Sequence, residues 1–531
     1  MTGDQGVKRK TCREVGRLWR FVPILLLAGI LPACTSSPPI TPVQPAPDYA
    51  IPPGDDGAFA AIEAEIRAGH GNGVSGFKLV DRNEDGLRWR LALIDAARHS
   101  IDLQYYLWYG DAAGQLLAQR IFASADRGVK VRMLVDDLNT LLQDAGSVAL
   151  RDRAVAWMDA HPNLEVRLFN PWTNREIAGR VVEGLGDLPR LNKRMHNKAM
   201  VVDNQATILG GRNIGDEYMG LNAAFNFHDL DVLGIGPVAR QASTVFDAYW
   251  NSEWVLPVSA LGIELSPEEI AAARVELAAR LERTASLAQI PLAPQSPAEA
   301  LSLLPAMAYF GESEVHSDLP RGDAIDHVML ERIRSMMAET RRELLIVNAY
   351  IIPVDYGIER LRAINGAGGE SRILTNSLAS HDVPAVNSHY KQWRKPIIET
   401  GAELYEMRHD PRMQSAVCDT APTRAAFCGL HSKAMVVDRE RVYIGSMNYD
   451  PRSAIHNTEM GVFIDSPGLA AALAQLMHRG MEPANSWRVE QDERGRLIWS
   501  SDAGTEYRQP ARNAWQRVED FFFRAFPKSL Y

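Results

Sequence analysis

The chain is 531 residues long, 46% of its residues are hydrophobic, and its formal net charge at pH 7 is -9. This length is more than one domain normally holds. The acidic balance argues against a nucleic-acid partner, because the protein as a whole would repel a polyanion.

The N-terminus has the pattern of an export signal. Six basic residues precede an apolar run over residues 21–31, which is too short to span a bilayer comfortably, and Leu31-Pro-Ala-Cys34 follows. This pattern predicts a signal peptide over residues 1–33. It resembles a bacterial lipoprotein signal, in which Cys34 becomes the lipidated first residue; an uncleaved signal anchor is the alternative. We therefore expect a protein of the cell envelope, lipid-anchored through Cys34 and facing the periplasm.

The signal carries a net charge of +4, so subtracting +4 from -9 leaves -13 for the mature chain. Residues 34–56 are rich in Pro and Ser and predict a flexible tether. Beyond the tether, predicted helices alternate with predicted strands, which is typical of an α/β fold. The helices are expected over 87–99, 114–127, 329–341 and 356–365, and the strands over 101–108, 129–135, 344–350 and 372–375.

The second half of the chain thus repeats the order of the first. Between the halves, Ser266-Pro-Glu-Glu269 forms a capping box that opens an Ala-rich helix ending near Thr284, and a Pro-rich stretch over 291–305 predicts a linker. These features predict a first domain over 57–262, a connector over 263–310, a second domain over 311–483 and a C-terminal extension over 484–531. The aromatic stretch 521–526 is expected to dock on the core rather than touch lipid.

One phrase occurs twice. His196-Asn-Lys198-Ala-Met-Val-Val-Asp203 and His431-Ser-Lys433-Ala-Met-Val-Val-Asp438 are identical at seven of eight positions. Gly210-Gly-Arg-Asn213 and Gly445-Ser-Met-Asn448 follow at the same distance. Each copy predicts a strand, a tight turn and a second strand, with the histidine and lysine on one face of the first. Repetition over this distance indicates two copies of one unit, whose histidines would meet at an interface.

This set of residues suits a phosphodiester. One histidine can attack phosphorus, and the other, when protonated, can donate a proton to the departing alkoxide. The two lysines, with Asn213, Asn448 and the neighbouring Ser446, would bind the non-bridging oxygens. No metal is expected, because an ammonium group two residues from each histidine would repel a bound cation.

Histidines used in this way need partners that orient the ring. Asp229 and Glu459 each precede an apolar, strand-like run about thirty residues beyond a histidine. Their matching positions favour this orienting role, and the alternative is an ordinary acid at the start of a strand that faces solvent. Cys418 and Cys428, ten residues apart, could form a disulfide in an oxidising compartment or remain two free thiols.

The duplicated motif, HxKxxxxD followed by G[GS]xN, resembles the signature of the phospholipase D superfamily. The resemblance implies two similar α/β sandwich domains related by a pseudo-twofold axis, with one active site at their interface and no cofactor. It implies a supporting role for the motif aspartates more than a reacting one. The site residues would be His196, Lys198, Asp203, His431, Lys433 and Asp438, with Asn213, Ser446 and Asn448.

Stretches such as 201–218, 375–380 and 448–453 are similar to the cardiolipin synthase C branch of that superfamily. This implies membrane phospholipids as substrates and cardiolipin made from phosphatidylglycerol and a second phospholipid, such as phosphatidylethanolamine, through a covalent phosphohistidine on His196. Hydrolysis to phosphatidic acid is the alternative, and a nuclease or a non-catalytic lipid-binding protein is less favoured. An accessory protein is possible for this branch, and the oligomeric state stays open.

Overall fold

The computed structural model describes residues 44–137, 148–302 and 304–523, all of which belong to one compact unit of the chain. The expected signal, Cys34 with the rest of the tether up to residue 43, and the last part of the aromatic stretch lie outside the described residues.

The first half forms a mixed sheet whose parallel strands lie on one side of the repeated motif. Strands β2, β3 and β4 are parallel, and the remaining pairs are antiparallel. In order across the sheet the strands are β1 (Ser75–Val80), β8 (Asp231–Ile235), β6 (Ala206–Gly210), β5 (Lys198–Val202), β2 (Ser100–Tyr105), β3 (Lys130–Asp136), β4 (Leu164–Phe169) and β9 (Val255–Pro257).

The second half repeats this order strand for strand, with the same parallel and antiparallel pairs. Its strands are β10 (Tyr309–Ser317), β19 (Met460–Asp465), β18 (Arg441–Gly445), β17 (Lys433–Val437), β13 (Glu343–Asn348), β14 (Glu370–Asn376), β15 (Glu403–Met407) and β20 (Ser486–Gln491), extended by β21 (Leu497–Ser501) and β22 (Gly504–Glu506). The predicted fold class, two similar α/β domains in one chain, is therefore confirmed.

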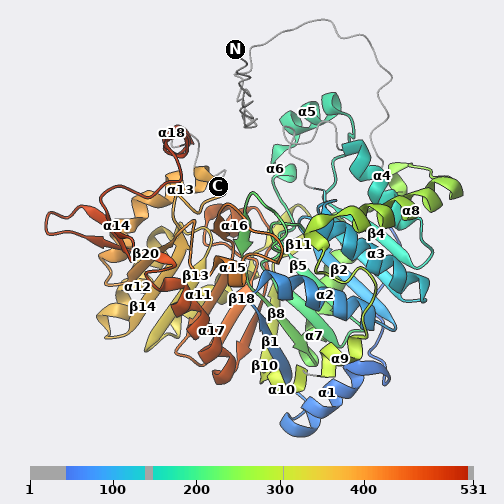
Figure 1. Cartoon of the computed structure of the whole chain (residues 1–531), viewed down its shortest axis with the longest axis horizontal. Coiled ribbons are helices and arrows are strands. Elements are labelled where there is room, and N and C mark those ends of the chain that lie inside the picture. Colours follow the sequence, from blue (N-terminus) through green and yellow to red (C-terminus); the bar gives the residue numbers. More distant parts are fainter. Residues whose placement is uncertain (1–43, 138–147, 303, 524–531) are drawn as a thin grey trace, which may run out of the picture. The chain divides into compact units, whose positions relative to one another are not determined.

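The two sheets are joined through their edge strands, because β1 pairs antiparallel with β10 (Figure 1). One hydrophobic core runs under this join: it contains Val201 of β5 and Val436 of β17, packed with Ala239 of helix α7 (Pro237–Trp250) and Leu473 of helix α17 (Pro467–Met481). The pairing of β1 with β10 leaves neither of these edges open, and the burial of this core holds the halves together.

The opposite face of each sheet carries its own helices. Alternate residues of β5 and β17 point to that face, where Met200 packs with helices α2 (Asn83–Ala96) and α3 (Ala112–Asp126), and Met435 packs with α11 (Val328–Ala338) and α12 (Val354–Gly366). Each domain is thus a sheet between two helical layers, which explains why β5 and β17 are buried along their whole length and are apolar after the first residue.

The predicted helices and strands of both halves are present, with ends that differ by at most four residues. Helix α8 (Pro267–Arg283) starts at Ser266, whose side chain accepts from Glu269 N while the Glu269 carboxylate accepts from Ser266 N. The Pro-rich stretch expected as a linker contains the short helices α9 (Pro297–Ser302) and α10 (Leu304–Met307), because Leu301 is buried in the core of the first domain.

The domain limits inferred from the sequence stay a proposal, and β20 shows that the C-terminal extension adds strands to the second sheet. The remaining helices are α1 (Gly57–His70), α4 (Val148–Asp159), α5 (Ile177–Gly186), α6 (Leu188–Leu191), α13 (Pro384–Tyr390), α14 (Arg394–Ile398), α15 (Gln414–Val417), α16 (Pro451–Ile455) and α18 (Ala514–Phe523), with 3₁₀ turns at Val258–Leu261, Ala285–Leu287 and Lys391–Trp393.

The expectation that the aromatic stretch docks on the core is wrong for two of the three described residues, while the third, Phe523, is half-buried. Phe521 and Phe522, at the end of α18, are each 71% exposed. Helix α18 packs against the fold with Gln516 and Asp520 instead.

Candidate active site

The two copies of the repeated phrase form equivalent hairpins at the centre of each sheet. His196 lies two residues before β5 and His431 two residues before β17. The motif aspartates Asp203 and Asp438 lie in the turns that follow, each with a positive φ. Asp203 accepts hydrogen bonds from the backbone N–H groups of residues 98–100, and Asp438 from those of residues 341–343. Both aspartates thus fasten the start of a neighbouring strand, β2 or β13, and do not contact the histidines.

The orienting acids are exchanged between the halves. His196 Nδ1 is 2.9 Å from Glu459 Oε2, and His431 Nδ1 is 2.6 Å from Asp229 Oδ2. Each histidine therefore contacts the carboxylate of the other domain. Both acids are fully buried, so neither is an ordinary strand-start residue that faces solvent.

The backbone enforces this exchange. The N–H of His431 donates to His228 O at 2.9 Å, within the parallel pairing of β7 (Asn226–His228) and β16 (Cys428–Leu430). The N–H of His196 donates to Thr458 O, also at 2.9 Å, through a single parallel bridge between Met195 and Thr458. In both places the residue after the paired carbonyl is the acid, so one pairing brings the carboxylate to the ring.

The two lysines lie beside the histidines on the same strand faces. Lys198 Nζ donates to the carbonyl of His196 at 2.7 Å, and Lys433 Nζ donates to the carbonyl of His431. Burial lowers the pKa of Lys433 to about 8 and that of Lys198 well below its usual value. Burial destabilises the protonated form of both lysines. The negative charge of an incoming phosphate would stabilise that form, so the two lysines suit an anionic ligand.

Burial also lowers the pKa of both histidines. The pKa of His196 falls well below its usual value, with the charges of Lys198 and Lys433 adding to the effect. The pKa of His431 falls under burial and the charge of Lys433, while Asp229 opposes the fall. Burial therefore disfavours the protonated form of both rings, and Asp229 makes His431 the better placed of the two to carry a proton.

The pKa values of the two orienting acids also differ, with that of Asp229 lowered and that of Glu459 raised. Burial would raise the pKa of Asp229, but the hydrogen bond from His431 and the charges of Lys433 and Arg212 keep it below its usual value. Burial raises the pKa of Glu459 to about 8, against the opposing charge of Lys198 and a hydrogen bond from Ser446. The His431 pair is thus built around a stable carboxylate, and the His196 pair around one that can exchange its proton.

The trailing Gly and Ser of the motifs fit this difference. A Cβ on Gly211 would lie 2.1 Å from Asp229 Oδ1, so only glycine leaves room there for the carboxylate. At the equivalent position, the fully buried Ser446 donates its hydroxyl proton to Glu459. Ser446 therefore holds the Glu459 carboxyl in position and is not placed as a direct substrate contact.

The two asparagines have different surroundings. Asn213 Oδ1 accepts from Leu107 N at 3.3 Å, whereas Asn448 Oδ1 is buried without a hydrogen-bond partner among the described residues. Sequence reasoning missed the aromatic rings around the histidines. Tyr106 lies edge-on to His196 at 4.9 Å between ring centroids, and Tyr218 lies edge-on to His431 at 5.2 Å. Tyr106 directly follows β2, the strand that pairs with the motif strand β5, and this position in the sequence could have indicated that its ring lies near His196.

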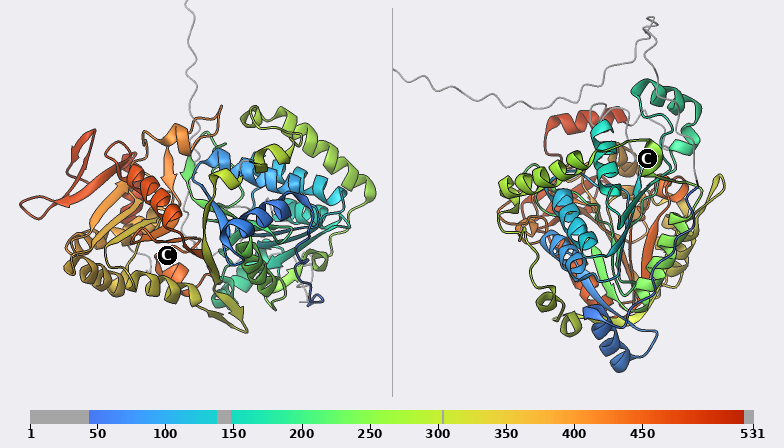
Figure 2. Two further views of the ribbon diagram at one scale, coloured as in Figure 1. Left: turned by 90° about the horizontal axis from the view of Figure 1, so that it is seen from below. Right: turned by 90° about the vertical axis from the view of Figure 1, so that its right-hand side faces the viewer.

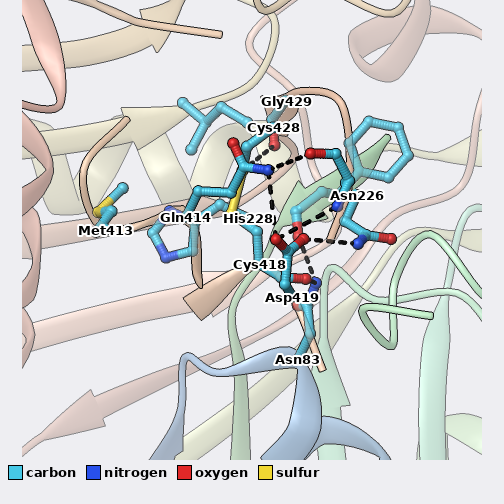
Figure 3. The surroundings of a disulfide bond; sticks show 12 residues. Asn83, Asn226, His228, Met413, Gln414, Cys418, Asp419, Cys428 and Gly429 are labelled. Atoms are coloured by element: carbon cyan, nitrogen blue, oxygen red, sulfur yellow. Dashed lines mark hydrogen bonds between the residues drawn. A yellow bond between two sulfur atoms is a disulfide. The ribbon is translucent and has the colours of Figure 1, made fainter. Parts of the chain in front are cut away.

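Cys418 and Cys428 form a disulfide (Figure 3). Cys428 begins β16, whose last residue precedes His431. The surrounding contacts cross the domain interface: Asn83 donates to Cys418 O at 2.8 Å, and Asn226 donates to Asp419 Oδ1 at 2.9 Å. The disulfide thus fixes the base of the strand pair that joins Asp229 to His431.

Comparison with known proteins agrees with this geometry. The family model described as "Cardiolipin synthase, PLD-like domain" matches residues 91–250 and 333–481. Cardiolipin synthase C of Escherichia coli K12 is 35% identical over 458 residues, covering 84% of this chain and 94% of its own. A cardiolipin synthase of Geobacillus kaustophilus is 26% identical and covers 70% of this chain and 59% of its own.

Among solved structures, phosphatidylserine synthase of Haemophilus influenzae has a TM-score of 0.52 at 15% identity, covering 80% of this chain and 91% of its own. That likeness shows a shared fold. The duplicated domains and paired motifs define a phospholipase D-like enzyme. The chain belongs to the cardiolipin synthase family with PLD-like domains. The family predicted from the two motifs is confirmed.

Removing the disulfide is expected to loosen the His431 side of the interface. In the chain-entropy view, a closed loop of about ten residues contributes roughly 2–3 kcal/mol. The double variant Cys418→Ala/Cys428→Ala should therefore have a lower midpoint of thermal unfolding and a lower rate of enzymatic turnover. Both are measured beside the wild type in its oxidised and its reduced form. Reduction should reproduce the variant's midpoint. Equal midpoints for all three would contradict a structural role for the bond.

Glu459→Gln should change how the stability of the protein depends on pH. Between the pKa of an unfolded glutamate, about 4.3, and the folded value of about 8, the folded chain keeps a proton that the unfolded chain has lost. The free energy of unfolding of the wild type therefore falls relative to the variant as pH rises through this window. Denaturant unfolding at pH 5, 7 and 8.5 measures the difference.

Asp229→Asn is the matched control for that series. The folded pKa of Asp229 lies below its unfolded value, so its carboxylate stabilises the fold above that value and loses this contribution on acidification. This variant should therefore be less stable than the wild type at neutral pH. A constant difference between Glu459→Gln and wild type at all three pH values would contradict the shifted pKa.

Proposed function

We propose that this enzyme is a phosphatidyltransferase that makes cardiolipin from phosphatidylglycerol and a second phospholipid, phosphatidylethanolamine. One observation carries the proposal: two imidazoles meet at one interface, each with Nδ1 bound to a carboxylate of the opposite domain. That contact fixes the tautomer and leaves Nε2 of each ring for phosphorus and proton chemistry. Membership of the cardiolipin synthase family supports phospholipids as the substrates.

In the first step, His196 Nε2 attacks the phosphorus of the donor phospholipid. The bond between phosphorus and the headgroup oxygen breaks, and that oxygen takes a proton from His431 Nε2. The lower pKa of His196 suits the neutral nucleophile, and the ionised Asp229 suits a histidine that must carry a proton. The product is a covalent phosphatidyl-His196 and a free headgroup alcohol.

In the second step, His431 removes a proton from a glycerol hydroxyl of phosphatidylglycerol. The oxygen attacks phosphorus, the bond to His196 breaks, and cardiolipin leaves. Lys198 and Lys433, with Asn213 and Asn448, would bind the non-bridging oxygens on which charge grows. We propose supporting roles for Asp203, Asp438 and Ser446, because they contact backbone or Glu459 rather than the rings.

We further propose that the enzyme is anchored through Cys34 and faces the periplasm, as the N-terminal pattern predicts. None of the described helices is both long and apolar enough to cross a membrane. The domain limits 57–262 and 311–483 are proposed with this reading. Water in place of phosphatidylglycerol would make the same site a phospholipase D.

Purified protein given phosphatidylglycerol and phosphatidylethanolamine should form cardiolipin, identified by mass spectrometry. His196→Ala should abolish the product, whereas His316→Ala, a histidine on β10 outside the site, should not. Phosphatidic acid without cardiolipin would identify water as the acceptor, and an unchanged rate in His196→Ala would contradict the proposed site.

The assignment of the two histidines is testable with a donor that carries a p-nitrophenyl leaving group. This group departs without a proton, so His431→Ala should still form the covalent adduct and release p-nitrophenolate in a burst. Peptide mass spectrometry should find the phosphatidyl group on His196. An adduct on His431 in the His196→Ala variant, with none in the reverse case, would exchange the two roles.

A further inference from the structure

Two short helices are packed inside out. In α5, the buried Arg180 donates to Asn174 O at 3.0 Å, and the Glu183 carboxylate accepts from the backbone N–H groups of Thr173 and Asn174. The described valine and leucine side chains of α5 and of the start of α6 face outward instead. Val182 is 71% exposed and Leu185 is 85% exposed, and Val181 and Leu188 are exposed as well.

Helix α18 has the same arrangement. Asp520 is buried and accepts hydrogen bonds from Asn387 and Lys391, both at 2.6 Å, and the buried Gln516 donates to Leu378 O. The outward face carries the apolar side chains Trp515, Val518, Phe521 and Phe522. An amphipathic helix normally buries its apolar face. In both helices, polar side chains make the contacts with the fold instead, and the apolar side chains named here are exposed in the described part of the chain.

Both helices are connected to the site, one through the chain and the other through packing contacts. Helix α6 follows α5 and ends at Leu191, five residues before His196. Helix α18 packs on the segment 378–391, in which His381 stacks on Tyr350, and that tyrosine ring lies edge-on to His431. Figures 1 and 2 (right view) place α5 and α18 at the same end of this unit.

We propose that α5, the start of α6 and α18 form one docking surface for a lipid bilayer, defined by Val181, Val182, Leu185, Leu188, Trp515, Val518, Phe521 and Phe522. This rests on the proposed function, because phospholipid substrates reside in a bilayer and the site must be brought to its surface. Aromatic and branched apolar side chains on a short helix with a polar opposite face are typical of interfacial insertion. One helix is connected to the segment that leads to His196 and the other packs on the segment that contacts Tyr350 beside His431, so a bilayer bound to both helices would lie near both halves of the site.

The first test is site-specific photo-crosslinking in the full-length protein. A photoreactive amino acid in place of Val182 or Phe522 should label lipid in vesicles of phosphatidylglycerol and phosphatidylcholine. The same substitution at Val275, which is also 71% exposed but lies on α8, should not. Equal labelling at all three positions, or crosslinks to a second copy of the chain in place of lipid, would overturn the proposal.

The second test separates docking from chemistry. Phe521→Ser/Phe522→Ser and Val182→Ser/Leu185→Ser should each raise KM for vesicle phospholipid by about tenfold, because two apolar side chains no longer insert. The rate on short-chain phosphatidylglycerol dispersed as monomers should stay unchanged. Equal losses on both substrates, or no loss on vesicles, would overturn the proposal.

The two proposals fail in different ways. If the wild type transferred no phosphatidyl group with either vesicle phospholipid or short-chain phosphatidylglycerol, the proposed function would be contradicted. Lipid labelling at positions 182 and 522 would still support the docking surface. His196→Ala should be labelled as the wild type is, since His196 takes no part in binding the bilayer. Loss of labelling in that variant would contradict the independence of the surface from the chemistry.

Discussion

The site depends on the exchange of carboxylates between the two domains. His196 has its partner on the second domain and His431 has its partner on the first. A single domain would therefore contain a histidine without an orienting acid and a buried acid without its histidine. Breaking such a buried pair costs about 3–5 kcal/mol, because one charge is left uncompensated. Assembly of the interface and assembly of the site are thus the same event.

Two further features serve this constraint. The β1–β10 pairing and the core beneath it keep the sheets in one register, so that the short pairings at β7–β16 and Met195–Thr458 can form. The disulfide then fixes one of these pairings at its base. The two pairings differ in extent, three residue pairs against one, and the acids beside them differ in pKa. A nearly symmetric frame therefore holds two histidines in unequal electrostatic surroundings, as a nucleophile and an acid require.

The inside-out helices follow a different rule from the rest of the fold. Elsewhere, apolar side chains fill the layers on both faces of the sheets. In α5 and α18 the polar side chains make the inward contacts, so the apolar side chains are free to contact the lipid bilayer proposed above. A site buried between two domains needs such a device if its substrates are amphiphiles held in a bilayer.

Much of this protein was determined by sequence alone. The repeated phrase identified the paired hairpins, the family and the histidines, because hairpin geometry and side-chain alternation are local properties of His196-Asn-Lys198 and His431-Ser-Lys433. The capping box at Ser266 and the alternation of helices and strands were local too. Only the tertiary structure decided which acid meets which histidine, because Asp229 and His431 are joined by a pairing between strands 202 residues apart. It also decided that Ser446 supports Glu459 and that Phe521 and Phe522 face outward, since burial depends on what the rest of the chain places beside a residue.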